Sequence, residues 1–102
     1  MVTYEVTTLV ESGLVEAYER YMRHRHIPDV LATGCFSEAV FSRAAPGRYR
    51  VCYEAPSEVD LERYLAMHAP RLREEFASQF LEGVTVSREL WVALQSWTAS
   101  PR

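Results

Sequence analysis

The chain has 102 residues, of which 48% are hydrophobic and 25% charged, and its formal net charge is −3. This length and composition are typical of one globular domain and argue against a disordered chain. The negative charge disfavours nucleic acid as a partner, because cationic side chains drive that binding by releasing counterions. No apolar run approaches the ~20 residues of a membrane span, so we also expect no membrane partner.

Localisation and cofactor use are judged from what the sequence lacks. The N-terminus has neither the basic segment nor the apolar core of a signal peptide. The two cysteines, Cys35 and Cys52, form no metal-type cluster, and the phosphate-loop, zinc-protease and dithiol motifs are absent. The sequence therefore predicts a cytoplasmic protein with reduced cysteines, no metal and no cofactor.

The first quarter of the chain predicts a strand followed by a helix. Residues 2–10 alternate and are rich in β-branched side chains, which is typical of a half-buried strand. Ser12 is the expected cap of the following helix, whose broad apolar face includes Tyr18 and Tyr21. Pro28 disfavours helical geometry at the residue before it, so we expect this helix to stop or kink near His26. A short second helix is then expected to run through residue 33 and to end at Gly34.

A hairpin is predicted next, with strands over 35–43 and 48–55 and a turn over 44–47. If the turn is centred between residues 45 and 46, Ala39 faces Cys52 and Phe41 faces Arg50. This register places Glu38 beside Tyr53 on the helix-covered face of the sheet. The same face then carries Phe36, Val40, Val51 and Tyr53, and the opposite face carries Cys35, Ser37, Ala39, Phe41, Arg50, Cys52 and Glu54. Cys35 and Cys52 are too far apart in this register to form a disulfide.

The second half predicts a broken helix and a last strand. Ser57 and Asp60 fit a capping box, and Pro70 predicts a kink or a restart near Ala69. The second helical segment is expected over 71–81, Gly83 ends it, and residues 84–91 alternate as a strand. We expect one domain over 1–91 and a tail over 92–102, which extends the strand, contacts a second copy or hangs free.

The predicted order β, α, β, β, α, β defines the fold class. It is α+β and ferredoxin-like, with a four-stranded antiparallel sheet and both helices on one face. The opposite face is too apolar for water and too mixed for a core, so we expect two such faces to pack together in a homodimer.

Several segments carry a family resemblance: residues 4–6 (YEV), 26–36 (HIPDVLATGCF), 61–65 (LERYL) and 68–73 (HAPRLR). Together they resemble a small bacterial family of uncharacterised function within the dimeric α/β-barrel superfamily. That superfamily includes cofactor-free monooxygenases, isomerases and ligand-binding regulators. The resemblance spans about residues 2–90. It implies a fold and a dimer, and no particular reaction.

Candidate site residues follow from where histidines and tyrosines should meet. If both helices cover one sheet face, His26 and His68 lie across a pocket, where either is a candidate general base. The expected ligand-binding residues are Tyr21, His26, Glu38, Tyr53, His68 and Arg71. Structural roles compete with each assignment: His26 can stabilise a helix end, His68 can be a core histidine, and Arg71 can pair with nearby glutamates.

Three functions remain open from the sequence. The first is a small-molecule-binding dimer with a pocket between helices and sheet. The second is a structural or interaction dimer without a ligand. The third is a cofactor-free monooxygenase or isomerase with a histidine base. An empty enclosed cavity would favour the first or the third, and a filled interior the second.

Overall fold

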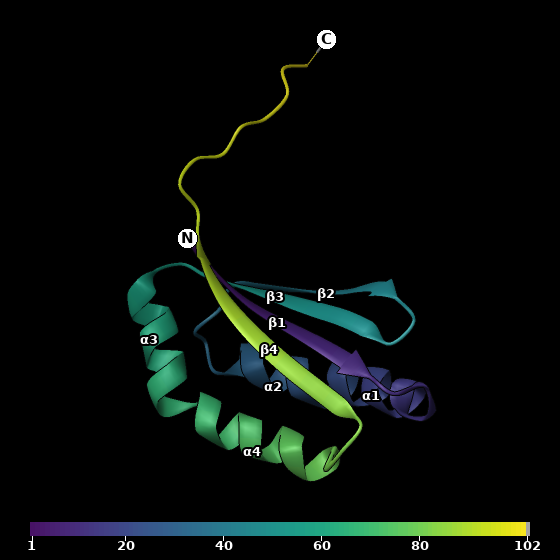
Figure 1. The fold of residues 1–102 in the computed structure, drawn as a ribbon. Helices are drawn as coiled ribbons and strands as arrows, with labels where there is room; N and C mark the ends of the chain where they lie inside the picture. Colours follow the sequence, from purple (N-terminus) through teal and green to yellow (C-terminus); the bar gives the residue numbers. More distant parts are fainter. Residues whose placement is uncertain (102) are drawn as a thin grey trace.

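A computed structural model describes residues 1–101 and shows a four-stranded sheet with its helices packed on one side (Figure 1). The elements in chain order are β1 Val2–Val10, a 3₁₀ turn Ser12–Leu14, α1 Val15–Tyr21, a π-helical turn Met22–His26, α2 Ile27–Ala32, β2 Glu38–Ala45, β3 Arg48–Ala55, α3 Glu58–Met67, α4 Ala69–Gln79 and β4 Val84–Val92.

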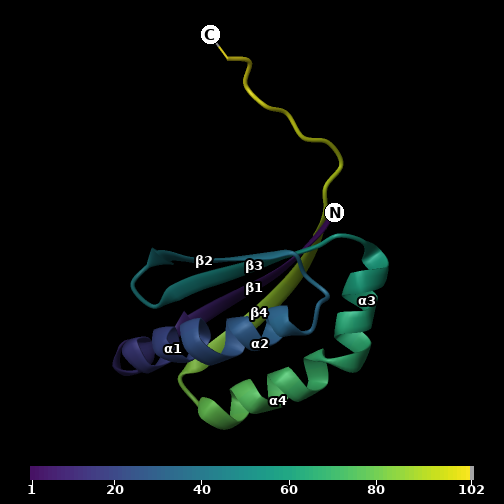
Figure 2. The same cartoon turned by 180° about the vertical axis from the view of Figure 1, so that it is seen from behind.

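The sheet has the strand order β2-β3-β1-β4, and every neighbouring pair is antiparallel. The helices lie on one side of the sheet, as two opposite views show (Figures 1 and 2). The protein is therefore an α+β, ferredoxin-like domain, as the element order predicts. The described residues contain no helix long and apolar enough to cross a membrane.

The helical segment before Pro28 differs from the prediction. Ser12 makes no capping hydrogen bond, and Glu11 occupies the position before the first turn. The helix continues past His26 through the π-helical turn, in which the Ile27 N–H donates to the Met22 carbonyl. A π turn inserts one residue without breaking the helix, and Pro28, which has no N–H to donate, lies in the first turn of α2. Gly34 then ends the helix with a φ of 77°, as predicted.

The register of the hairpin is one residue away from the prediction. Strand β2 begins at Glu38, Val40 faces Cys52, and Ala39 faces Tyr53. The turn is centred one residue later than expected, and an irregularity lies between Arg43 and Ala45. A one-residue slip moves every side chain of a strand to the other face. Glu38 and Val40 therefore lie on the face of the sheet that no helix covers, which we call the open face. The prediction that Glu38 lies beside Tyr53 on the helix-covered face is wrong.

Gly47 explains why the turn sits where it does. Its φ is 80°, and its carbonyl oxygen accepts from the Val10 N–H at 2.7 Å. A Cβ at this position would lie 2.5 Å from the Val10 carbonyl oxygen. Only glycine fits both the left-handed backbone and this close approach of the hairpin to β1.

The helical arm from α3 to α4 follows the prediction closely. The Ser57 hydroxyl accepts from the Asp60 N–H at 3.3 Å and donates to its carboxylate at 2.9 Å. The helix breaks at His68, which is not helical, and restarts at Ala69 with Pro70 in the first turn. The second segment ends at Gln79, two residues earlier than expected. This break lets α3 and α4 lie along different parts of the sheet (Figure 2).

The Ser57 cap gives a direct stability test. We expect Ser57→Ala to lower the free energy of unfolding by about 1 kcal/mol, because an orphan helix N–H loses its acceptor. Ser12→Ala is the matched control and should change it by less than about 0.5 kcal/mol, because Ser12 caps nothing. Urea unfolding followed by circular dichroism measures both. Equal losses in the two variants would contradict the cap assignment.

Candidate functional site

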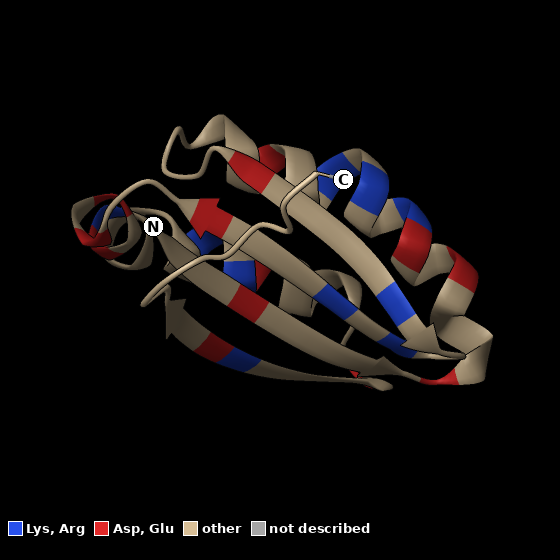
Figure 3. Ribbon diagram, turned by 90° about the horizontal axis from the view of Figure 1, so that it is seen from above, with Lys and Arg blue, Asp and Glu red and all other residues tan. Residues whose placement is uncertain are grey.

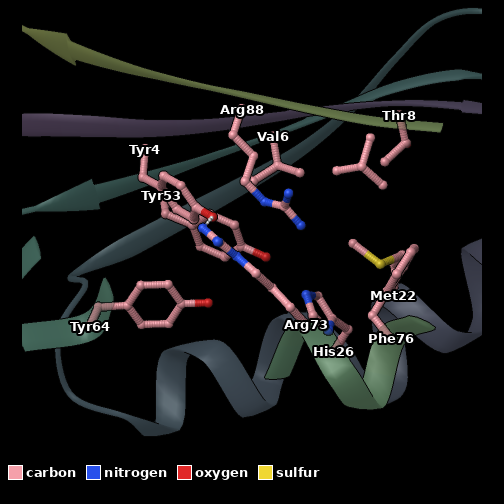
Figure 4. A pocket seen from close by; sticks show the side chains of 11 residues that line it. Tyr4, Val6, Thr8, Met22, His26, Tyr53, Tyr64, Arg73, Phe76 and Arg88 are labelled. Carbon is pink, nitrogen blue, oxygen red and sulfur yellow. Dashed lines mark hydrogen bonds between the residues drawn. The ribbon is translucent and has the colours of Figure 1, made fainter. Parts of the chain in front are cut away.

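A cavity lies between the covered face of the sheet and the helices (Figure 4). The side chains around it come from β1, β3, β4, the π-helical turn, α3 and α4. They are Tyr4, Val6, Thr8, Met22, His26, Tyr53, Tyr64, Arg73, Phe76, Val86 and Arg88. This lining combines apolar walls with hydroxyls, an imidazole and two guanidinium groups, which is the composition expected of a binding site.

The cavity is narrow in the unliganded structure. The space between its lining atoms, including the open mouth, is about 400 Å³, but only about 30 Å³ of it admits the centre of a water molecule. That is room for one or two waters. Arg73 and Arg88 extend into this space (Figure 4). A larger molecule can therefore enter only if these long side chains change rotamer.

Stacked aromatic rings form one wall of the cavity. The ring of Tyr4 lies 5.9 Å from that of Tyr53 and 5.7 Å from that of Tyr64, and Phe36 packs behind all three. Burial raises the pKa of Tyr53 and of Tyr64 well above the usual value of 10. Both phenols are therefore protonated donors at neutral pH.

The Tyr53 hydroxyl has no hydrogen-bond partner, although the residue is only 2% exposed. Tyr18, the other fully buried tyrosine in the core, shares a 2.6 Å hydrogen bond with Thr8. A buried hydroxyl left unpaired costs free energy, and native interiors rarely contain one. The Tyr53 hydroxyl is thus a buried donor without a partner, on a residue that lines the cavity.

His26 forms the floor of the cavity from the helical side. Its ring lies 5.4 Å from Phe76 and 6.0 Å from Tyr21. Burial lowers the pKa of His26 to about 4, and the positive charge of Arg88 acts in the same direction. The imidazole is therefore neutral at pH 7 and can accept or donate one hydrogen bond from each nitrogen.

Two arginines from different elements bring positive charge to the cavity. Arg73 on α4 donates from Nη2 to the Tyr4 hydroxyl at 3.0 Å. Arg88 on β4 faces Val6 across the ladder, so it lies on the covered face of the sheet. Within residues 1–101 neither guanidinium lies within 4.0 Å of a carboxylate.

The structure brings together only some of the residues expected from the sequence. His26 and Tyr53 line the cavity, and Tyr21 packs against the His26 ring without lining it. His68 and Arg71 lie in a separate, open groove, so His68 does not face His26 across a pocket as expected. Glu38 lies on the opposite face of the sheet, where it is exposed.

The cavity also contains Tyr4 and Tyr64, which the sequence offers as part of an aromatic cavity wall, and Arg73, which it offers as part of an anion clamp beside Pro70. Sequence reasoning missed Arg88 as a site residue. A signal for Arg88 was present, because a charged residue occupies an inward position of an otherwise apolar strand alternation. Among the described residues, no three histidine, cysteine, aspartate or glutamate side chains are placed to hold a metal ion. Cys35 and Cys52 are free thiols.

The element order and the strand order define a ferredoxin-like α+β domain with a cavity between its sheet and its helices. Residues 1–93 match the family described as a domain of unknown function, DUF4286, and the chain belongs to this family. A search of the curated proteins found no match.

Solved structures with the same fold share little sequence with this chain. A Deinococcus radiodurans protein assigned as an antibiotic biosynthesis monooxygenase has 12% identity and a TM-score of 0.74, with 99% of this chain and 100% of that chain covered. SnoaB, a cofactor-independent oxygenase from Streptomyces nogalater, has 15% identity and a TM-score of 0.70, with 93% and 94% covered. A dimeric ferredoxin-like protein from an uncultured marine organism has 10% identity and a TM-score of 0.69, with 96% and 98% covered. At such identities the likeness shows the fold alone.

Proposed function

We propose that this protein is a homodimeric small-molecule-binding module that holds its ligand in the cavity beneath the sheet. One observation carries the proposal: the buried Tyr53 hydroxyl has no partner and lies in the lining of a space shared with other polar groups. A cavity that served only packing would be apolar and filled. Here the exposed side chains of Arg73 and Arg88 and the half-buried ring of His26 converge on the same space, where a bound ligand would find several hydrogen-bonding partners.

Replacing Tyr53 by phenylalanine tests whether its hydroxyl serves a ligand or the fold. We expect Tyr53→Phe to leave the unliganded protein as stable as the wild type or up to about 1 kcal/mol more stable, because it removes an unpaired buried group. Tyr18→Phe should instead lose about 1–3 kcal/mol, because the buried Thr8 hydroxyl loses its partner. Thermal and urea unfolding measure both.

The same pair of variants then tests binding. A thermal-shift screen of small molecules on the wild type should find compounds that raise the melting temperature. Tyr53→Phe should weaken these shifts, whereas Tyr18→Phe should preserve them, since Tyr18 does not line the cavity. A Tyr53→Phe variant that is strongly destabilised, or a screen in which no compound shifts the protein, would contradict the proposal.

The homodimer is proposed from the open face of the sheet. Three large apolar side chains are exposed there: Leu9 at 55%, Val40 at 51% and Trp91 at 53%. The strand pairing gathers glutamates near one end of this face and arginines near the other (Figure 3). The acidic set is Glu5, Glu38, Glu54 and Glu89, and the basic set is Arg48 and Arg50. A two-fold axis perpendicular to the strands would place the basic end of one copy over the acidic end of the other.

An enzyme with a histidine base is the second candidate, favoured by the position of His26 in the cavity. A pKa near 4 makes this imidazole a weak base, and general base catalysis is most efficient when the pKa lies near the working pH. Binding is therefore better supported than turnover. Turnover that His26→Ala abolishes while binding persists would establish an enzyme. An interaction dimer without a ligand leaves the vacant Tyr53 donor unexplained.

A further inference from the structure

We propose that the cavity selects a small aromatic acid, whose anionic group binds between Arg73 and Arg88 and whose ring lies against the tyrosine wall. This inference rests on the function proposed above and adds the chemical class of the ligand. Four properties of the cavity support it: its charge, the direction of Arg88, its hydrogen-bond donors and its walls.

The cavity is positively charged within an acidic protein. Its lining contains two arginines and neither aspartate nor glutamate, although the chain has 14 acidic residues and a net charge of −3. Other arginines of the chain, such as Arg63 and Arg71, form ion pairs with carboxylates at 3.2 and 3.6 Å. Arg73 has only the neutral Tyr4 hydroxyl as a partner. Two cations that share a space without a counter-charge are matched by an anion.

Arg88 faces this space because of the strand register. On β4 the residues on the covered face are Val84, Val86 and Arg88, which pair with Val10, Thr8 and Val6. Arg88 follows two inward, half-buried valines and is itself exposed, so its charge lies beside the cavity without being fully buried. Figure 4 shows the guanidinium of Arg88 directed into the cavity from the strand above, while Arg73 enters from the helical side.

The remaining polar groups favour an acceptor-rich ligand. The buried phenol of Tyr53 is a hydrogen-bond donor without an acceptor. A carboxylate can accept hydrogen bonds from several donors, because its two oxygens present about four lone-pair sites. Two guanidinium groups and a phenol can all donate to one carboxylate. A primary amide of the same shape has one acceptor oxygen and adds two N–H donors, which would face the arginines unpaired. The donor set therefore discriminates an acid from its amide.

The walls of the cavity favour an aromatic ring behind that anionic group. On one side Tyr4 stacks on Tyr53 and is tilted against Tyr64. On the other side lie His26 and Phe76. Aromatic rings prefer to pack at such separations in offset or edge-to-face geometry. Since the unliganded cavity has room for only one or two water molecules, the arginines must move to admit a ring. Their attraction to the anion provides the free energy for that rearrangement.

Matched probes test the charge and the ring separately. Benzoate, benzamide and sulfate are titrated into the full-length protein, and ¹H–¹⁵N NMR shifts of residues in α4 and β4 are followed. We expect benzoate to bind with saturation, and benzamide and sulfate to bind at least about tenfold more weakly, since each lacks either the charge or the ring. Raising the salt concentration should weaken benzoate and not benzamide.

Arginine variants assign any binding to this cavity. Arg73→Gln and Arg88→Gln should each weaken benzoate at least about tenfold. Arg71→Gln is the matched control, because Arg71 lies two residues from Arg73 on the same helix but lines a different groove. Its benzoate affinity should equal that of the wild type.

The outcomes separate this inference from the proposed function. Equal affinity for benzoate and benzamide, or benzoate binding unchanged in both cavity variants, would overturn the aromatic acid and leave a binding module of another selectivity. Sulfate binding as tightly as benzoate would overturn the role of the ring. Failure of all three probes overturns the aromatic acid, and the compound screen described above then decides alone whether the cavity binds a small molecule.

Discussion

Reversing the two open-face arginines is expected to convert the proposed dimer into a monomer. In Arg48→Glu combined with Arg50→Glu, the basic end of the face becomes acidic, so that glutamates of the two copies face each other. Like charges opposed across an interface cost several kcal/mol, and two-fold symmetry repeats every such contact. We expect the dimer dissociation constant to rise at least about a hundredfold. Sedimentation velocity over a concentration series measures it.

Two further variants separate the effect of the interface from that of total charge. Arg20→Glu combined with Arg25→Glu changes the net charge equally, but both residues are exposed on the helical side. This variant should remain dimeric. A copy with Glu5→Arg and Glu54→Arg, mixed with the Arg48→Glu and Arg50→Glu copy, should restore heterodimers. A wild type that is monomeric at micromolar concentration would contradict the dimer, and a dimeric reversal variant would contradict the charge pairing.

The register of the hairpin decides what this interface contains. With the predicted register, Phe41 and Ala39 would lie on the open face and Val40 beneath the helices. The structure reverses all three, because the hairpin turns at Gly47 and not one residue earlier. The sequence alone contains the Pro46–Gly47 turn signal but not the close approach of Val10, which selects glycine for the left-handed position. Such a tertiary contact cannot be found from local pattern.

Other parts of the fold were predictable because the signal was local. The alternation of β1, the Ser57 cap and the break at Pro70 each depend on residues within a few positions of one another, and the structure confirms all three. The π-helical turn was not predictable, because Pro28 alone does not say whether a helix ends or widens. A widened turn keeps Met22 and His26 on the inward side of one continuous helix, where both line the cavity.

The site was only half predictable for a related reason. His26 and Tyr53 were found by residue type, but Arg88 belongs to β4, which meets α4 and the π-helical turn only in the folded chain. Arginine is so common on solvated surfaces that its presence in a helix or an edge strand indicates little by itself. Its inward direction becomes visible only when the pairing of Arg88 with Val6 is known.

Acid should destabilise this protein through His26 before its carboxylates are protonated. The folded pKa of His26 is about 4, below the ordinary value of 6.5, mainly because of burial. Arg88 also lowers this pKa, while Asp29 and Glu75 raise it. Between pH 6.5 and 4, His26 is protonated in the unfolded chain but not in the folded protein. The free energy of unfolding therefore falls as the pH drops from about 6.5 to 4. Because the ring is partly exposed, we expect a loss of about 2 kcal/mol over this window.

His26→Gln shows how much of this pH dependence of the free energy of unfolding is due to His26. Urea unfolding at a series of pH values should show a flatter profile between pH 6.5 and 4 in the variant than in the wild type. Parallel profiles would contradict a buried neutral imidazole and would remove the reason to regard His26 as a weak base. A flatter profile would show that the cavity keeps His26 uncharged at neutral pH. The positive charge of the cavity then comes from Arg73 and Arg88 alone.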